Sequence, residues 1–109
     1  MSKHLIITHD GKEYTLEFTR RTVQQMEQQG FSVEDLDRKP MSTLPKLFAG
    51  AFLAHHRFMR QGEIDEIYDS LENKAELITK LAEMYSEPIA ALVNEPEESE
   101  GNATWRADW

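Results

Sequence analysis

Hydrophobic residues recur with helical spacing in the longest apolar part of the chain, residues 44–58. Side chains three, four, seven and eight positions apart lie on one face of a helix. Here those positions hold Leu44, Leu47, Phe48, Ala51, Phe52, His55 and Phe58. Few charges precede Arg57 on the other side, so more than one side of the helix should be covered. We therefore predict a central helix over residues 43–58, capped by Ser42 or Thr43.

The N-terminal residues follow a different pattern, with a period of two. Tyr14, Leu16 and Phe18 alternate with polar residues, which gives an extended strand one apolar and one polar face. Asp10-Gly11 separates this run from an earlier apolar run, and Asp-Gly is a strong signal for a tight hairpin turn. We predict a β-hairpin over residues 3–18. Because a lone hairpin is marginal in water, it should lie on the central helix or pair its edge with a neighbouring subunit.

Capping residues mark the helix that follows the hairpin. Thr19 stands at an N-cap position, and Gly30 is the usual residue for a left-handed C-terminal cap. These residues bound a predicted short helix over 20–29. Residues 32–36 are typical of a single capped turn.

Two further helices are predicted in the C-terminal half, over residues 63–72 and 74–94. Asn73 and Glu76 have the spacing of a capping box at the start of the last helix. Its apolar stripe continues past Pro88, which should kink the helix or split it near Ser86.

The length and composition indicate one small domain. The chain has 109 residues, of which 39% are hydrophobic, enough for a single core. We predict an α+β, mainly helical fold over residues 1–94, with the hairpin packed on a bundle of about four to five helices. Residues 95–109 are acidic, lack apolar periodicity and are predicted to be a disordered tail. The tryptophans Trp105 and Trp109 in this tail either form a short docking motif or pack weakly, if at all.

The net charge of −8 is unevenly distributed. Residues 1–62 hold nine Lys and Arg against seven Asp and Glu, whereas residues 63–109 hold three against thirteen. An acidic half repels phosphate backbones and anionic lipids, and the basic residues are too scattered to overcome this repulsion. We therefore expect no nucleic-acid partner and no membrane partner. With no apolar run near the roughly 20 residues needed to cross a bilayer, the chain is expected to be soluble and not secreted.

The candidate chemical groups favour no enzyme, metal site or cofactor site. The chain has no cysteine and no phosphate-binding or nucleophile motif. Four carboxylates lie at helical spacing, but without the histidine partners of a dinuclear metal site or the pattern of a calcium loop, so a solvated face is expected. They are Asp65, Asp69, Glu72 and Glu76. The adjacent His55 and His56 would point about 100° apart on a helix and could not chelate one ion.

The overall pattern resembles a known family. The resemblance is carried by the hairpin ending at residues 14–20, the stop at Gly30-Phe31, the helix over 44–58, residues 69–81 and the tail ending at residues 102–105. Together these segments resemble the tail assembly chaperones of long-tailed (siphovirus-type) phages and prophages of Gram-positive bacteria. The likeness covers nearly the whole chain but rests on pattern, because this family has no invariant catalytic motif.

The resemblance implies a non-enzymatic protein of the host cytoplasm that is absent from the mature virion. Its expected partners are the tape measure protein, which it would bind and keep soluble, and the tail tube protein; self-association is also expected. Members of the family are often extended by translational frameshifting, which a protein sequence does not reveal. The alternative is a structural tail completion protein that forms a ring in the virion.

A partner helix would be bound along the apolar surfaces of the central and last helices. The candidate partner-binding residues are Leu47, Phe48, Phe52, Leu81, Met84, Tyr85, Ile89 and Leu92. The pattern alone does not separate core residues from interface residues in this set. Introducing a charge at Met84 or Leu92 is expected to abolish partner binding without loss of helix.

Overall fold

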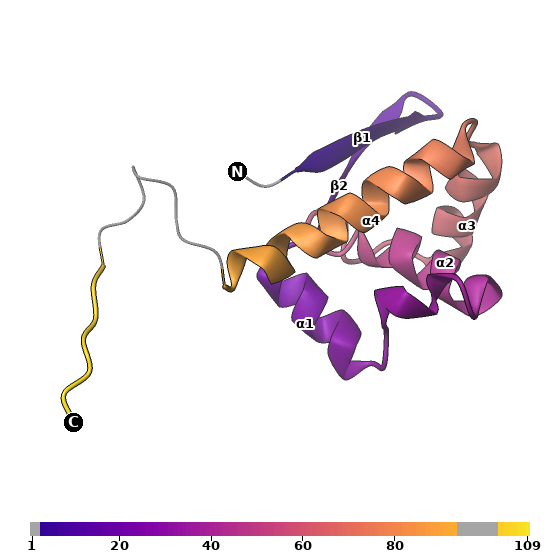
Figure 1. The fold of residues 1–109 in the computed structure, drawn as a ribbon. Helices are drawn as coiled ribbons and strands as arrows, with labels where there is room; N and C mark the ends of the chain where they lie inside the picture. The colour runs from indigo at the N-terminus through magenta and orange to yellow at the C-terminus, as the bar shows by residue number, and fades with distance from the viewer. Residues whose placement is uncertain (1–2, 94–102) are drawn as a thin grey trace.

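A computed structural model describes residues 3–93 and 103–109 (Figure 1). The fold is α+β and mainly helical, as predicted. Its elements in chain order are β1 (His4–His9), β2 (Lys12–Glu17), α1 (Arg20–Gln28), the 3-10 turn η1 (Val33–Leu36), α2 (Pro40–Gly50), α3 (Gln61–Ser70) and α4 (Lys74–Ala91). In the described part of the chain, no helix is long and apolar enough to cross a membrane.

The hairpin forms where the alternation predicts it. β1 and β2 pair antiparallel, with Leu5 opposite Leu16 and Ile7 opposite Tyr14. Asp10 and Gly11 adopt positive φ angles of 50° and 78°, as the tight turn requires. Leu16 is fully buried and Ile7 is 6% exposed, so this face of the hairpin belongs to the core.

Local caps set the limits of α1, as the sequence predicts. The Thr19 hydroxyl accepts a hydrogen bond from the Thr22 amide at 3.1 Å, and the Thr22 hydroxyl accepts one from the Thr19 amide at 2.9 Å. Gly30 closes the helix with a φ of 89°. Phe31 then donates its amide to the Met26 carbonyl at 3.0 Å and is 8% exposed.

The central helix differs from the prediction at both ends. α2 begins at Pro40, with Lys39 rather than Ser42 or Thr43 as its N-cap residue. Proline suits this position because its fixed φ is already helical and its missing amide would have no helical acceptor. α2 ends at Gly50 rather than at residue 58, and turns follow it.

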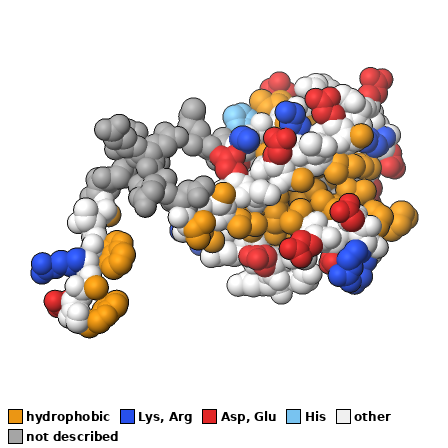
Figure 2. All heavy atoms as spheres, viewed as in Figure 1, with side chains coloured by type: hydrophobic (Ala, Val, Ile, Leu, Met, Phe, Trp, Pro, Cys, Tyr) orange, Lys and Arg blue, Asp and Glu red, His pale blue; other side chains and the backbone are white. Residues whose placement is uncertain are grey.

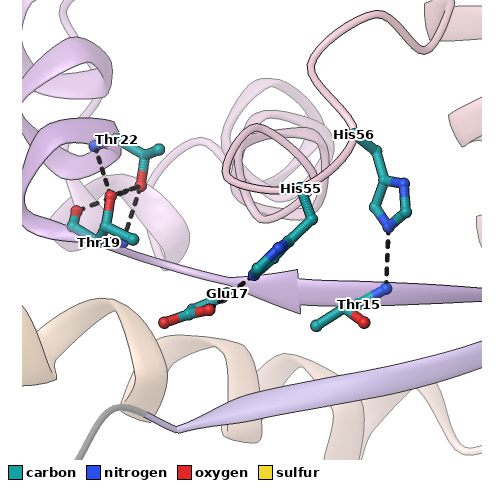
Figure 3. A network of polar contacts seen from close by, with 6 residues as sticks. All are labelled: Thr15, Glu17, Thr19, Thr22, His55 and His56. Atoms are coloured by element: carbon teal, nitrogen blue, oxygen red, sulfur yellow. Dashed lines mark hydrogen bonds and ion pairs between the residues drawn. The ribbon is translucent and has the colours of Figure 1, made fainter.

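A long-range seam explains why the helix stops early. The Ala51 carbonyl accepts a hydrogen bond from the Glu17 amide at 2.9 Å, and His56 Nε2 accepts one from the Thr15 amide at 3.0 Å. His55 Nε2 lies 2.7 Å from Glu17 Oε1 (Figure 3). Residues 51–56 are therefore held along the outer edge of β2, which a continuing helix could not do. Sequence periodicity carries no information about such a contact.

The C-terminal helices also have shifted limits. α3 covers Gln61–Ser70 instead of 63–72, and α4 covers Lys74–Ala91 instead of 74–94. Asn73 adopts the left-handed conformation and its side chain donates to Glu76 Oε2 at 2.7 Å, so the predicted capping box does not form. α4 is not split at Pro88, because this proline removes a single amide close to the helix end.

Helix α4 packs against both α1 and α2. Figure 1 shows the hairpin along one side of α4 and helices α1 and α2 on the other. Tyr85 of α4 is 2% exposed and lies edge-on to Phe18 and Phe31, with ring centroids 5.3 and 5.2 Å apart. The aromatic contacts of Tyr85 therefore join the hairpin, the end of α1 and α4 in one core.

The predicted disordered tail is described only in part. Residues 95–102 of that prediction lie outside the described residues. Residues 103–109 form neither helix nor strand, and their side chains are exposed. Trp105 and Trp109, 87% and 103% exposed, do not pack on the domain.

Burial of Tyr85 makes stability depend on alkaline pH. Burial raises the pKa of its phenol above the ordinary value of 10.0, and the Glu27 carboxylate raises this pKa further. Below about pH 10 the phenol is protonated in both states, whereas above it the unfolded chain loses the proton first. Stability should therefore fall as pH rises above about 10. The urea midpoint should drop more between about pH 8 and pH 10.5 in the wild type than in Tyr85→Phe.

The comparison with Tyr85→Phe isolates this phenol, because the other two tyrosines, Tyr14 and Tyr68, are present in both proteins. Equal drops in the two proteins would show that Tyr85 ionises as easily in the folded as in the unfolded state.

Candidate functional site

The structure divides the predicted partner-binding residues into two groups. Six of them belong to the core and are exposed by 3% or less: Leu47, Phe48, Phe52, Leu81, Met84 and Tyr85. Ile89 and Leu92, near the end of α4, are 42% and 59% exposed. Of the eight, only these two have side chains that are largely accessible to a partner. Their role as partner-binding residues stays a prediction.

A groove with a volume of about 880 Å³ runs along α2 and is lined largely by apolar side chains. Met41, Leu44 and Phe48 of α2, followed by Leu53, line one part of the groove, which we call its floor. Met26 and Phe31, at the end of α1, and Tyr68 of α3 line its sides. We call this surface the α2 groove. Figure 2 shows hydrophobic side chains gathered in a band beside α4, with Asp and Glu side chains around it.

The sequence contains a signal for the groove that the central-helix prediction did not use. Met41, Leu44, Pro45 and Phe48 follow the spacing of a helical stripe once the helix begins at Pro40. With the helix placed at 43–58, Met41 fell outside it. Met41 is 90% exposed in the structure, so the stripe begins on the surface and ends in the core.

The floor of the groove includes aromatic side chains that pack against one another. Phe48 is 2% exposed and its ring lies 5.0 Å from that of Tyr68 and 5.1 Å from that of Phe52, in edge-on contacts. The Lys74 ammonium lies 5.5 Å from the centre of the Tyr68 ring. Aromatic side chains held in this way form a preformed apolar surface, which loses little conformational entropy on binding.

The α3 side of the groove is acidic. Asp65 and Asp69 both line the groove and are exposed. The Gln61 side-chain amide donates to Asp65 Oδ1 at 2.8 Å. Lys46, on α2, contributes a positive charge to the lining. The groove therefore suits an apolar segment that carries a cationic side chain on one flank.

A second group of chemically interesting side chains lies at the hairpin turn. His9, Asp10 and Glu66 place one potential ligand atom each within 4.8 Å of one another. Asp10 and Glu66 are exposed, and exposed acidic side chains often lie this close without a metal. Glu66 lies far from His9 and Asp10 in the sequence, and the contact joins the hairpin to α3 across the fold.

The adjacent histidines His55 and His56, which were predicted not to chelate one ion, contact different residues. His55 is paired with Glu17, whereas His56 accepts a hydrogen bond from the Thr15 amide and lies edge-on to Tyr14, with ring centroids 5.3 Å apart. Both histidines hold residues 51–56 on β2. The acidic residues 65, 69, 72 and 76 are all exposed, and the first two lie on α3 whereas Glu76 lies on α4.

Comparison with known proteins identifies a family but not a function. No curated protein and no solved structure matches the chain. A family model described as Domain of unknown function (DUF5055) matches residues 1–109, the whole chain. The chain therefore belongs to the DUF5055 family.

Proposed function

We propose that this chain is a non-enzymatic tail assembly chaperone of a long-tailed phage or prophage. In this role it binds the tape measure protein in the host cytoplasm, keeps it soluble, assists assembly of the tail tube and leaves before the virion is complete. The proposal rests on the resemblance described above and on one structural observation, the α2 groove.

The groove supports binding of an amphipathic helix. Helix-in-groove recognition needs an apolar trough that accepts side chains at helical spacing, with polar groups at its margins. Met41, Leu44 and Leu53 provide exposed or half-exposed apolar side chains, and Asp65 and Asp69 provide the polar margin. A long helical protein with a repeated apolar stripe could occupy the grooves of several copies in succession.

The exposed end of α4 is a second apolar surface. Ile89, Leu92 and Val93 are 42%, 59% and 85% exposed. Apolar side chains grouped on a surface are typical of interaction sites. This surface either extends the partner contact or mediates self-association.

Co-expression with the long helical tape measure protein tests the proposal. Capture of that protein on the chain and an increase in its soluble fraction are expected. Leu44→Glu places a charge in the groove and should weaken capture at least about tenfold, which corresponds to 1.4 kcal/mol. Phe58→Glu is the matched control, because Phe58 is 93% exposed and does not line the groove. Equal capture by both variants would exclude the groove, and no capture by the wild type would contradict the function.

The alternative, a ring-forming virion component, is favoured by the free edge of β1. Thr15 and Glu17 direct their amides to residues 51–56, so the residues opposite them, Ile6 and His4, direct their backbone groups away from β2. In the described part of the chain, no strand pairs with this edge. A ring needs this edge to bind a different surface of the next copy, because pairing of β1 with β1 would close a dimer. Protein gels of purified particles distinguish the two functions, because a chaperone should be missing from them.

A further inference from the structure

The C-terminal segment carries two large apolar side chains that the described domain leaves in solvent. Trp105 and Trp109 are 87% and 103% exposed, and they are the only tryptophans of the chain. Arg106 lies between them. Residues four positions apart fall on the same side of the chain in both an extended and a helical conformation. The segment can therefore present both indole rings to one surface.

The α2 groove has the complementary chemistry. Its floor offers the half-exposed Leu44 and Leu53 to an aromatic ring, and its α3 side offers the carboxylates of Asp65 and Asp69 to a guanidinium. In the part of the chain that the structure describes, neither carboxylate forms an ion pair. An apolar trough beside two acidic groups matches a segment with two tryptophans and an arginine.

We propose that residues 103–109 dock into the α2 groove of their own chain. Trp105 and Trp109 then cover the floor of the groove, and Arg106 pairs with Asp65 or Asp69. In the structure the side chains of this segment are exposed (Figure 1). Docking closes the groove and makes the segment a built-in competitor of any partner that uses the same surface. The docking itself does not depend on the proposed chaperone function.

The short connection between the domain and the C-terminal segment favours docking within one chain over docking between two copies. Trp105 follows Val93 by twelve positions, which can span at most about 40 Å. The 18 residues of α4, the longest helix, cover only about 27 Å. A tether of this length gives an effective concentration of about 1 mM. A segment with a Kd of about 0.1 mM would then be docked about nine-tenths of the time, whereas a second copy at micromolar concentration would not compete.

Tryptophan fluorescence of the full chain tests the proposal without any partner, because all of its signal comes from the C-terminal segment. Acrylamide quenching of the wild type should be several-fold weaker than that of free N-acetyl-tryptophanamide, and independent of protein concentration. Leu44→Glu should raise the quenching to the free value. Phe58→Glu, outside the groove, should leave it unchanged.

A charge exchange tests the contact with Arg106. Asp69 is exposed, so Asp69→Lys should not disturb folding. It should, however, increase the acrylamide quenching of the tryptophans. The double variant Asp69→Lys with Arg106→Glu should restore protection. Three results would overturn the proposal: wild-type quenching equal to the free value, protection that appears only at high protein concentration, and protection that survives both Leu44→Glu and Asp69→Lys. The second would assign the contact to another copy, and the third to another surface.

Discussion

Replacing Met84 with glutamate is expected to unfold the domain, whereas Leu92→Glu should leave it folded. Both positions belong to the apolar stripe of the last helix, but Met84 is 3% exposed and Leu92 is 59% exposed. Burying a carboxylate without a partner, and losing the packing of the thioether, should cost about 5 kcal/mol or more. A domain of this size has a total stability of about 5–15 kcal/mol. Far-ultraviolet circular dichroism and urea unfolding measure the difference.

Met84→Leu is the control for this pair, because it nearly conserves volume and should cost less than about 1.5 kcal/mol. A folded Met84→Glu protein of wild-type stability would mean that α4 turns a different face to the core. Because Met84 is buried, the expectation that a charge introduced there would spare the fold conflicts with the structure. For Leu92 it stays a prediction, and Leu92→Glu tests whether the end of α4 contributes to partner binding.

Phe52→Ala is expected to destabilise the domain by about 3–5 kcal/mol, whereas Phe58→Ala should change stability by less than about 0.5 kcal/mol. Phe52 is 1% exposed and its ring lies 6.1 Å from that of Tyr14 and 5.1 Å from that of Phe48, in edge-on contacts. Phe58 is 93% exposed. Urea unfolding measures both changes, and if the two variants have equal m-values, the difference in their midpoints gives the difference in stability directly.

The two phenylalanines distinguish the observed end of α2 from the predicted one. A helix continued to residue 58 would place both on its buried face, and both substitutions would then be costly. Similar losses of stability for Phe52→Ala and Phe58→Ala would therefore contradict the structure. A large loss for Phe52→Ala alone would support the early end at Gly50.

The features predicted correctly from the sequence depend on neighbouring residues. The Asp10-Gly11 turn needs two adjacent positive φ angles, which these residue types tolerate. Thr19 and Gly30 cap α1 through contacts within a few positions. A hairpin and a capped helix of this kind are encoded locally, so their limits were predictable to within a residue or two.

One feature predicted wrongly, the end of α2, depends on distant residues. The end of α2 depends on hydrogen bonds that Thr15 and Glu17 make with residues far along the chain. Asn73 could have capped α4 through its side chain, but it adopts a left-handed conformation in the short connection from α3. Local pattern allows both outcomes at these positions, and at the end of α2 tertiary packing selects the shorter helix.

The candidate site was predictable only in outline. Helical spacing identified apolar faces on the central and last helices, and both exist. It could not show that Phe48 and Tyr85 are buried by other elements while Met41 and Leu92 face solvent. An apolar stripe has the same period whether it meets the chain's own core or a partner.

The seam along β2 also has a consequence for the order of folding during synthesis. The bond between Thr15 and His56 joins residues 41 positions apart. When the hairpin leaves the ribosome, both of its edges are therefore open, and the edge of β2 closes only after α2 and the turns that follow it have emerged. Contacts of such long sequence separation form late and slow the folding of small domains. Until then the nascent hairpin can pair with strands of other chains, so the interval before residue 56 emerges is when the protein is most exposed to aggregation.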